Sequence, residues 1–262
     1  MPISDVLFEK ENGIATLTLN RPDKYNALTT EMVGELRRIF EEMPRDDSVK
    51  VLIITGAGRA FCSGADVVRR LAGGEEPKKM RWELIRPRGS ELLPLAKLPK
   101  PTIAAINGVV AGVGNSLALA CDIRIASDHA RFTTAWVKMG LIPDGGATYF
   151  LPRILGISNA LELMFTGEMI NATEAERIGL VSRVVPHDDL MRVVKELAGK
   201  IAKGPSVAIE LMKMGAYRAL NHDLDSQIDF EIYAQGICRN TKDHKEGVEA
   251  FMQKREPKFE GE

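Results

Sequence analysis

The stretch from Thr102 to Asp122 reads TIAAINGVVAGVGNSLALACD, and the rest of the chain is arranged around it. Residues 103–106 form a short apolar run that is typical of a buried strand, and the small residues from Ser116 to Cys121 are typical of a buried helix. The two segments are separated by three glycines: Gly108, Gly112 and Gly114. Glycine permits positive φ and close approach of a ligand, and the free N–H groups of a first helical turn attract negative charge. From this stretch alone two interpretations are possible: a tight turn that binds nothing, or a site that stabilises an anion.

A second stretch, from Gly58 to Asp66, reads GRAFCSGAD and has the same form. It follows VKVLIIT, residues 49–55, which is typical of a buried strand, and it breaks into a turn of small residues before a charged segment. Two turns of this kind can each aim one backbone N–H at the same oxygen, and such a pair of donors stabilises an enolate or a tetrahedral oxyanion. The second stretch therefore favours the anion site.

The composition is that of an ordinary globular protein. The chain has 262 residues, of which 45% are hydrophobic and 27% charged, and its net charge of −1 gives no reason to expect a nucleic acid or a membrane as partner. Its three cysteines, Cys62, Cys121 and Cys238, match no metal-ligand spacing, so no metal is expected. An odd number of cysteines, with no signal pattern and no apolar run of membrane-spanning length, predicts a cytoplasmic protein.

The remaining pattern predicts strands and helices in alternation, followed by helices alone. Residues 6–10 and 14–19 alternate around Asn12-Gly13, which is typical of a β-hairpin. A helix is expected to begin with Thr29 or Thr30 as its cap. Further strands are predicted at residues 123–127, 130–132 and 181–185, and the pattern is helical from Asp188 onward.

Residues 69–89 are charged and interrupted by Gly and Pro, as in loops that shape a substrate site, and a helix is expected from Ser90 to Leu98. The chain is thus predicted to have an α/β core, residues 1–198, and a helical region, residues 199–262. The helical region has several apolar faces, so it is expected to pack on another subunit or on the core.

Asp144 is the candidate acid or base of the chain. It lies in a loop rich in glycine and proline, directly after Leu141, Ile142 and Pro143. A carboxylate enclosed by apolar residues holds its proton more tightly and becomes a usable base near neutral pH. An Asp before Gly-Gly-Ala-Thr is also good chemistry for a helix N-cap. The local sequence leaves both interpretations open.

Several motifs occur in one order along the chain. They are Asn20-Arg21-Pro22 with Asn26-Ala27-Leu28, the stretch from Gly58 to Asp66, Asn107-Gly108 with Ala111 to Gly114, Cys121 to Arg124, Gly140 to Gly146, and Phe251 to Arg255. Together they resemble the crotonase (enoyl-CoA hydratase/isomerase) superfamily over essentially the whole chain. Each motif is weak by itself, and their common order makes the resemblance strong.

The resemblance implies an α/β fold, a crotonase-type spiral of ββα units with a C-terminal helical oligomerisation region. It also implies an acyl-CoA thioester as substrate, with coenzyme A as part of the substrate and no separate cofactor, and a homotrimer or homohexamer. The N–H groups of Ala65 and Val113 would form the oxyanion hole. The resemblance further implies that the coenzyme A site is lined by Lys24, Ala27, Ser63, Gly64, Asp66, Val67 and Gly112, with Phe251 and Lys254 reaching the nucleotide in a neighbouring subunit.

Two positions depart from the pattern of the hydratases. Hydratases of this family hold a water between two glutamates, and this chain has Ser116 and Trp136 at the matching places. The loop around Asp144 resembles instead the single-Asp isomerases, which include the ring-opening isomerases of phenylacetate breakdown. A dehalogenase relative also pairs a Trp with an Asp, but it needs a histidine from the region before the central strand, and the first histidine here is His129.

These residues predict an enoyl-CoA isomerase that moves a double bond, or opens a ring, with one base. Asp144 would move the proton while the enolate oxygen is bound by the N–H groups of Ala65 and Val113. Trp136 is expected to form an apolar wall, and Ser116 to orient a ligand or fill space. Cys62 is expected to be a small buried residue, because no base for it is evident.

Two alternatives remain. The first is an enoyl-CoA hydratase or acyl-CoA hydrolase that uses the same oxyanion hole, with a second acid such as Glu83 or Glu91. The second belongs to another class: a non-catalytic subunit that binds coenzyme A, suggested by the absence of both glutamates.

Overall fold

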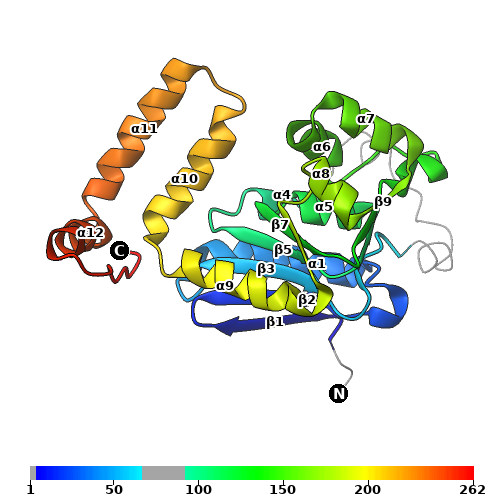
Figure 1. Ribbon diagram of the computed structural model, residues 1–262, viewed down its shortest axis with the longest axis horizontal. Helices are drawn as coiled ribbons and strands as arrows, with labels where there is room; N and C mark the ends of the chain where they lie inside the picture. The colour runs from blue at the N-terminus through cyan, green and yellow to red at the C-terminus, as the bar shows by residue number, and fades with distance from the viewer. Residues whose placement is uncertain (1–3, 67–91) are drawn as a thin grey trace, which may run out of the picture.

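Two β-sheets form the centre of the computed structural model, which describes residues 4–66 and 92–262 (Figure 1). The larger sheet has the strand order β1-β2-β3-β5-β7-β10, and the smaller has the order β4-β6-β8-β9. The strands are β1 (Val6–Glu11), β2 (Ile14–Leu19), β3 (Val51–Gly56), β4 (Ala60–Cys62), β5 (Thr102–Ile106), β6 (Val109–Ala111), β7 (Ile123–Ser127), β8 (Arg131–Thr133), β9 (Met169–Asn171) and β10 (Arg183–Val185).

Three consecutive pairs of strands each contribute one strand to the larger sheet and one to the smaller sheet. In each pair the first strand, β3, β5 or β7, joins the larger sheet, and the second, β4, β6 or β8, joins the smaller. The first strands pair with one another in parallel, and so do the second strands. The same unit thus repeats along the chain, which confirms the predicted spiral of ββα units.

Helices cover both sheets, and the last helices of the chain extend away from the sheets (Figure 1). They are α1 (Thr30–Glu42), α4 (Leu93–Ala96), α5 (Val113–Leu119), α6 (Ala147–Leu155), α7 (Ile157–Thr166), α8 (Ala172–Arg177), α9 (Leu190–Ala202), α10 (Ser206–Ala219), α11 (Leu224–Arg239) and α12 (Lys242–Gln253). Short 3-10 turns occur at η1 (Pro22–Lys24), η2 (Met43–Arg45), η3 (Ala135–Met139) and η4 (His187–Asp189).

The first elements form as the sequence predicts. Asn12 and Gly13 both have positive φ, which matches the twist of the hairpin that joins β1 to β2. Thr29 is the N-cap of α1, and its side chain accepts a hydrogen bond from the N–H of Met32. The helix expected from Ser90 to Leu98 is shorter, because α4 covers only four residues and Ser90 lies outside the described ones.

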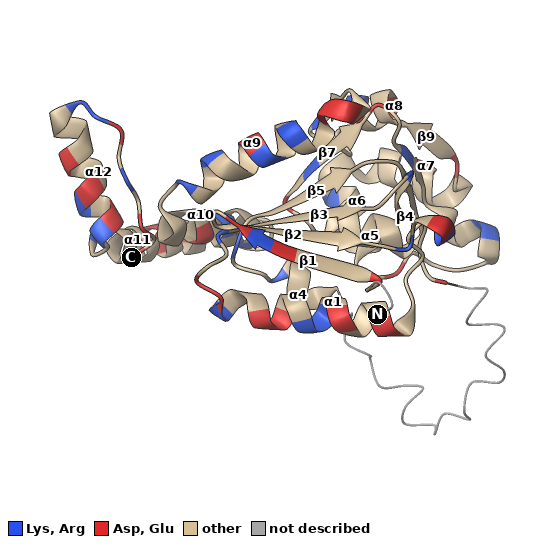
Figure 2. Ribbon diagram, turned by 90° about the horizontal axis from the view of Figure 1, so that it is seen from below, with Lys and Arg blue, Asp and Glu red and all other residues tan. Residues whose placement is uncertain are grey.

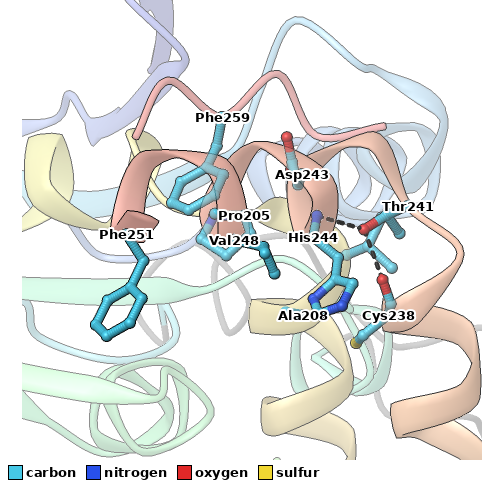
Figure 3. A pocket seen from close by; sticks show the side chains of 11 residues that line it. Pro205, Ala208, Cys238, Thr241, Asp243, His244, Val248, Phe251 and Phe259 are labelled. Carbon is cyan, nitrogen blue, oxygen red and sulfur yellow. Dashed lines mark hydrogen bonds between the residues drawn. The ribbon is translucent and has the colours of Figure 1, made fainter. Parts of the chain in front are cut away.

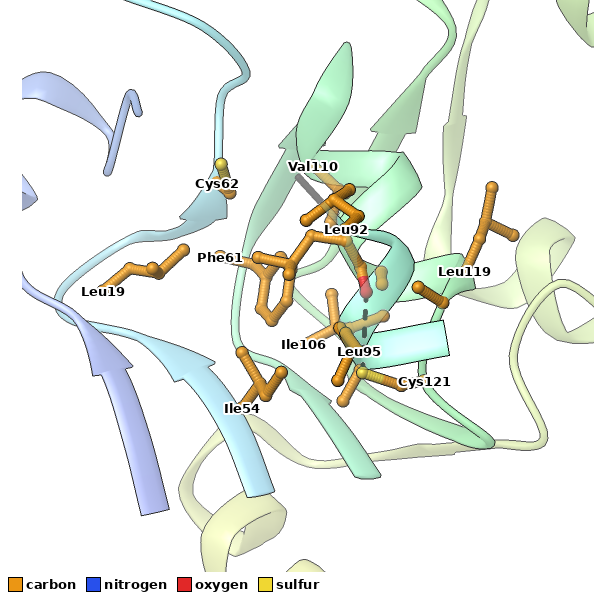
Figure 4. Packing of buried hydrophobic residues seen from close by; sticks show 14 of the residues in the cluster. Leu19, Ile54, Phe61, Cys62, Leu92, Leu95, Ile106, Val110, Leu119 and Cys121 are labelled. Atoms are coloured by element: carbon orange, nitrogen blue, oxygen red, sulfur yellow. Dashed lines mark hydrogen bonds between the residues drawn. The ribbon is translucent and has the colours of Figure 1, made fainter. Parts of the chain in front are cut away.

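The larger sheet is buried on both faces, which explains the unbroken apolar run of β3. Leu52 and Ile54 belong to the main hydrophobic cluster, together with side chains from α1, α5 and α6. Val51 and Ile53 face the other way and belong to a second cluster with α9. Figure 4 shows part of the main cluster, in which Phe61 of β4 lies among side chains from the larger sheet and α4. Complete burial of these side chains, at about 25 cal/mol per Å² of apolar surface, is the main force that holds the layers together.

The C-terminal helices differ in how they meet the core. Helix α9 lies against the larger sheet, whereas α10, α11 and α12 extend away from it (Figure 1). The predicted boundary between residues 198 and 199 lies inside α9, whose Ala198 and Ala202 pack in the second cluster. Helix α10 is tied to the core by Lys213 and Tyr217, whose side chains contact the Asp122 carboxylate at 2.7 Å and 3.0 Å.

Residues of both charges occur along α1 and α9 (Figure 2). Several of them form pairs four residues apart, such as Arg37 with Glu41 on α1 and Arg192 with Glu196 on α9. Exposed pairs of this kind contribute little to stability, because water and salt screen them. Within the described ranges, no helix is both long enough and apolar enough to cross a membrane.

The central stretch contains one strand that the sequence does not predict. Residues Val109–Ala111 form β6 between β4 and β8, and α5 begins at Val113 rather than near Ser116. Of the three glycines only Gly112 has positive φ, at +50°. A Cβ on Gly108 would lie 2.1 Å from the Arg59 carbonyl oxygen, and one on Gly114 would lie 2.3 Å from the Cys62 carbonyl oxygen. These two glycines are required because backbone packs directly on backbone.

We expect Gly114→Ala to destabilise the fold by about 3 kcal/mol or more, because a β-carbon at this position overlaps a main-chain oxygen that has no room to move. Gly199→Ala is the matched control. Gly199 lies in α9, and a Cβ there meets nothing within 4 Å, so the better helix propensity of alanine should stabilise by about 0.5–1 kcal/mol. Urea unfolding measures both changes. Equal stability of the two variants would contradict the close contact between α5 and β4.

Candidate active site

The two glycine-containing turns lie against each other in the structure. Gly64, at φ +104°, follows β4, and Gly112 directly precedes α5. A Cβ on Gly64 would lie 3.1 Å from the Ala111 carbonyl oxygen, and one on Gly112 would lie 3.7 Å from the α-carbon of Gly64. The residues that follow these glycines, Ala65 and Val113, are exposed and half-buried respectively. The two stretches that the sequence singled out therefore meet at the surface.

Among the described residues, the N–H groups of Ala65 and Val113 have no protein acceptor. Val113 is the first residue of α5, so its N–H has no acceptor within the helix. Ala65 forms a parallel bridge with Leu28, in which Gly64 and Asp66 on either side make the hydrogen bonds to Leu28. The N–H of Ala65 consequently points away from Leu28. Within residues 4–66 and 92–262, neither N–H donates to a protein acceptor.

Two buried asparagines hold the first turn in place. The Asn26 side chain is fully buried; its Nδ2 donates to the carbonyl oxygens of Ala57 and Ala60, at 3.0 Å and 2.7 Å. Nδ2 of Asn107 donates to the carbonyl oxygens of Gly58 and Ala60, at 2.8 Å and 3.1 Å. The motifs contain both asparagines, yet the sequence assigns no role to either, because their partners lie about 30 to 50 residues away.

The structure brings together most residues expected to line the coenzyme A site. The Ser63 N–H donates to the Tyr25 carbonyl oxygen at 2.9 Å, which places Ser63 and Gly64 beside Lys24 and Ala27. Arg21, which was not predicted, donates to the Ala27 carbonyl oxygen at 2.5 Å and to the Asp66 carboxylate at 3.0 Å. Val67 lies outside the described residues, as do the segment 69–89 and both Glu83 and Glu91.

Phe251 and Lys254 are not part of this group in a single chain. Both belong to the end of α12, on the far side of the molecule from α5 (Figure 1). Phe251 is 86% exposed and lies beside a separate cavity of about 360 Å³ between α10, α12 and the C-terminal residues (Figure 3). Their expected contact with a neighbouring subunit's coenzyme A is not tested by one chain.

Asp144 is not a helix cap. The N-cap of α6 is Gly146, and no side chain caps this helix. The Asp144 carboxylate instead accepts a hydrogen bond from Nε1 of Trp136, at 3.1 Å. The expected apolar enclosure around Asp144 is wrong for the single chain, because Asp144 is exposed and the neighbouring Ile142 is 76% exposed. The glycines on both sides turn this loop outward, with Gly140, Gly145 and Gly146 all at positive φ.

Ser116 and Trp136 both contact Asp144 from below the surface. Trp136 is only 4% exposed and packs in the main cluster, so in this structure its indole supports the carboxylate rather than forming an open wall. Ser116 has no exposed surface, and its Oγ donates to the main-chain oxygen of Asp144 at 2.8 Å. The hydroxyl expected to orient a ligand or fill space therefore bonds to the loop that carries the candidate base.

Cysteine and metal chemistry have less support at this site than proton transfer by a carboxylate. Cys62 is fully buried, and burial raises the pKa of its thiol to about 12, which confirms that it is a small buried residue and no nucleophile. In the part of the chain that the structure describes, no three His, Cys, Asp or Glu side chains are grouped to hold a metal ion. The geometry offers two open N–H donors and one supported carboxylate, which suits proton transfer beside an oxyanion.

The chain is similar to known proteins over almost its whole length. The family model described as enoyl-CoA hydratase/isomerase matches residues 9–262. The 1,2-epoxyphenylacetyl-CoA isomerase of Escherichia coli (strain K12) is 39% identical over 98% of each chain. The short-chain-enoyl-CoA hydratase of Clostridium acetobutylicum is also 39% identical, over 100% of this chain and 98% of its own. The crystal structure of an enoyl-CoA hydratase from Bacillus anthracis superposes with a TM-score of 0.91 at 35% identity, covering 99% of this chain and 100% of that one.

Proposed function

The chain belongs to the enoyl-CoA hydratase/isomerase family, and from that premise we propose that it is an enoyl-CoA isomerase with Asp144 as its single acid/base. The observation that carries the proposal is the surroundings of Asp144. Where hydratases of this family hold water between two glutamates, this chain has Ser116 and Trp136, and both donate hydrogen bonds to Asp144. Neither side chain can act as a carboxylate base, so one carboxylate does the proton transfer.

The proposed reaction begins with the thioester oxygen bound by the N–H groups of Ala65 and Val113. Two aimed donors, each worth roughly 3–4 kcal/mol in comparable oxyanion holes, make an adjacent C–H bond acidic. One oxygen of the Asp144 carboxylate accepts the Trp136 N–H, which leaves the other oxygen to take the proton. The C–H electron pair moves into a dienolate, and Asp144 returns the proton at the other end of the conjugated system. The double bond has then moved and the carboxylate is regenerated.

The names of the relatives do not choose between isomerisation and hydration, because an isomerase and a hydratase are equally similar to this chain. Hydration or thioester hydrolysis at the same oxyanion hole would need a second group to activate water. Addition of water to crotonyl-CoA at a rate comparable to double-bond migration would therefore favour the alternative. Tight acyl-CoA binding with no turnover of any enoyl thioester would favour a non-catalytic subunit.

The C-terminal helices support a proposal about assembly, a homotrimer or homohexamer. Helices α10 and α11 leave large apolar side chains open to solvent, including Met212, Leu224, Ile232 and Tyr233. Such a face is typical of an interface between subunits. In this proposal Phe251 and Lys254 contact the coenzyme A bound to the neighbouring subunit.

The first prediction is that Asp144→Asn abolishes double-bond migration and the exchange of substrate α- and γ-hydrogens with deuterium oxide. The amide keeps the shape of the side chain but cannot accept a proton, so acyl-CoA affinity should stay within a few-fold. Proton NMR of a 3-enoyl-CoA substrate measures exchange, and calorimetry measures binding. Asp128→Asn, the same change on an exposed side chain, should leave both intact. Normal exchange in Asp144→Asn would place the base elsewhere.

The second prediction concerns the oxyanion hole, where the donor is main chain. Val113→Pro removes the N–H at the first helical position, where proline is well tolerated, and should lower the isomerisation rate by about a hundredfold or more. Val113→Ala keeps the donor and should stay within a few-fold of the wild-type rate. Circular dichroism and thermal unfolding establish that both variants are folded. Equal rates in the two variants would mean that the Val113 N–H does not bind the oxyanion.

The third prediction is that removal of residues 242–262 weakens both assembly and coenzyme A affinity, because it takes away α12 together with Phe251 and Lys254. Analytical ultracentrifugation gives the oligomeric state, and calorimetry with an acyl-CoA gives the affinity. Met212→Asp, which places a charge on the exposed apolar face, should weaken assembly without removing a helix. A full-length protein that sediments as a fully active monomer would contradict the proposal.

A further inference from the structure

Helix α5 contacts each part of the site through consecutive residues. Gly114 packs on the Cys62 carbonyl and thereby sets the position of the turn that carries Ala65. The Asn115 side chain donates to the Thr133 carbonyl oxygen at 2.7 Å, which holds the end of β8 just before Trp136. The next residue along the helix, Ser116, donates its hydroxyl to the Asp144 main-chain oxygen at 2.8 Å.

The Asp144 loop has a conformation that needs support from outside. It contains three glycines at positive φ, and its apolar side chains, Leu141 and Ile142, are exposed, so little apolar packing holds it. The Asp144 oxygen accepts one further bond, from the N–H of Ala147, and the carboxylate accepts one from Trp136. Both donors lie within eight residues of Asp144. The Ser116 hydroxyl instead connects the loop to an element 28 residues away.

The position of Ser116 relative to the oxyanion donor gives this bond its significance. Val113 and Ser116 are three residues apart on α5, so they share a face of the helix and are separated by about 4.5 Å along its axis. A helix turn is rigid compared with a glycine-rich loop. An error of about 1 Å in the placement of a reacting group can lower a rate by about a hundredfold. Anchoring the loop to α5 therefore couples the position of the base to that of the oxyanion hole.

We propose that Ser116 is a positioning residue: its buried hydroxyl holds Asp144 at a fixed distance from the Val113 N–H, and it does not contact the substrate. The proposal rests on the proposed function for its kinetic consequence, but the hydrogen bond itself can be tested without turnover. A Cβ on Gly145 would lie 2.7 Å from the Ser116 β-carbon, so loop and helix are in direct contact at this point. Ser116 thus stands where hydratases of this family have a glutamate, but it holds the loop that carries the proposed base, Asp144.

Kinetics provide the first test. Ser116→Ala should lower kcat for double-bond migration by about 10- to 100-fold and change KM by less than about threefold, because binding is kept while the base is misplaced. Ser116→Cys, which keeps a weaker donor, should recover part of kcat. Thr55→Val is the matched control, since Thr55 is also a buried hydroxyl that donates to a main-chain oxygen, that of Ala105 at 2.9 Å, and its kcat should be unchanged.

Nuclear magnetic resonance provides a test that needs no substrate. The chain has two tryptophans, Trp82 and Trp136, so the ¹⁵N-labelled protein gives two indole N–H signals, which Trp82→Phe assigns. The Trp136 signal reports its bond to the Asp144 carboxylate. In Ser116→Ala it should move toward its position in Asp144→Asn, whereas in Thr55→Val it should stay at the wild-type position.

The outcomes separate the two proposals. Wild-type protein without isomerase or exchange activity overturns the proposed function, and the Trp136 signal still decides whether Ser116 positions Asp144. An active Ser116→Ala variant with unchanged kcat and an unchanged Trp136 signal overturns the positioning role. A rise in KM with kcat unchanged would also overturn it, because Ser116 would then contact the substrate. If Ser116→Ala does not fold, the kinetic measurement and the Trp136 signal are both taken from Ser116→Cys.

Discussion

The direct contact between the backbone of α5 and the backbone of β4 is the constraint on which the site depends. At Gly114 there is no space for even one carbon between the helix and the Cys62 carbonyl. This contact brings the turn that ends in Ala65 beside the first turn of α5, where the two N–H groups proposed to bind the oxyanion are located. Because both donors belong to the main chain, their directions are set by how the layers pack and by the two buried asparagines. Apolar packing alone has no directional preference and would not orient them.

Much of the fold can be predicted from local patterns in the sequence. The hairpin at Asn12-Gly13, the cap at Thr29 and the apolar run of β3 each depend on residues that are close in sequence. Strand β6 cannot be found in this way, because three residues between glycines carry no clear period and become a strand only by pairing with β4 and β8. The three extra residues at the start of α5, Val113 to Asn115, have the same origin. The glycines there suggest a loop, whereas the structure needs them for close packing.

For the candidate site, the sequence proposes residues but says little about how they are arranged in space. The order of motifs predicts a site of Ala65, Val113 and Asp144, and the structure brings the turns that carry the first two into contact. The apolar neighbours of Asp144 in sequence suggest enclosure, yet these side chains point to solvent, since a loop with several glycines can turn its apolar residues outward. The role proposed for Ser116 depends on a bond to a main-chain oxygen 28 residues away, and no local pattern encodes such a bond. Hydrogen bonds between a side chain and a main-chain atom far away in the sequence are therefore the contacts that sequence patterns predict least well.

The burial of Cys62 has a consequence for chemical compatibility. A conjugated enoyl thioester, the product of the proposed reaction, is an electrophile that adds thiolates at its β-carbon. Cys62 lies three residues before Ala65, whose N–H is proposed to bind the oxyanion. Its side chain points into the core, and with the pKa of its thiol at about 12 almost none of it is thiolate at neutral pH. Packing the sulfur beneath the turn thus protects the protein from alkylation by the compound that it is proposed to make.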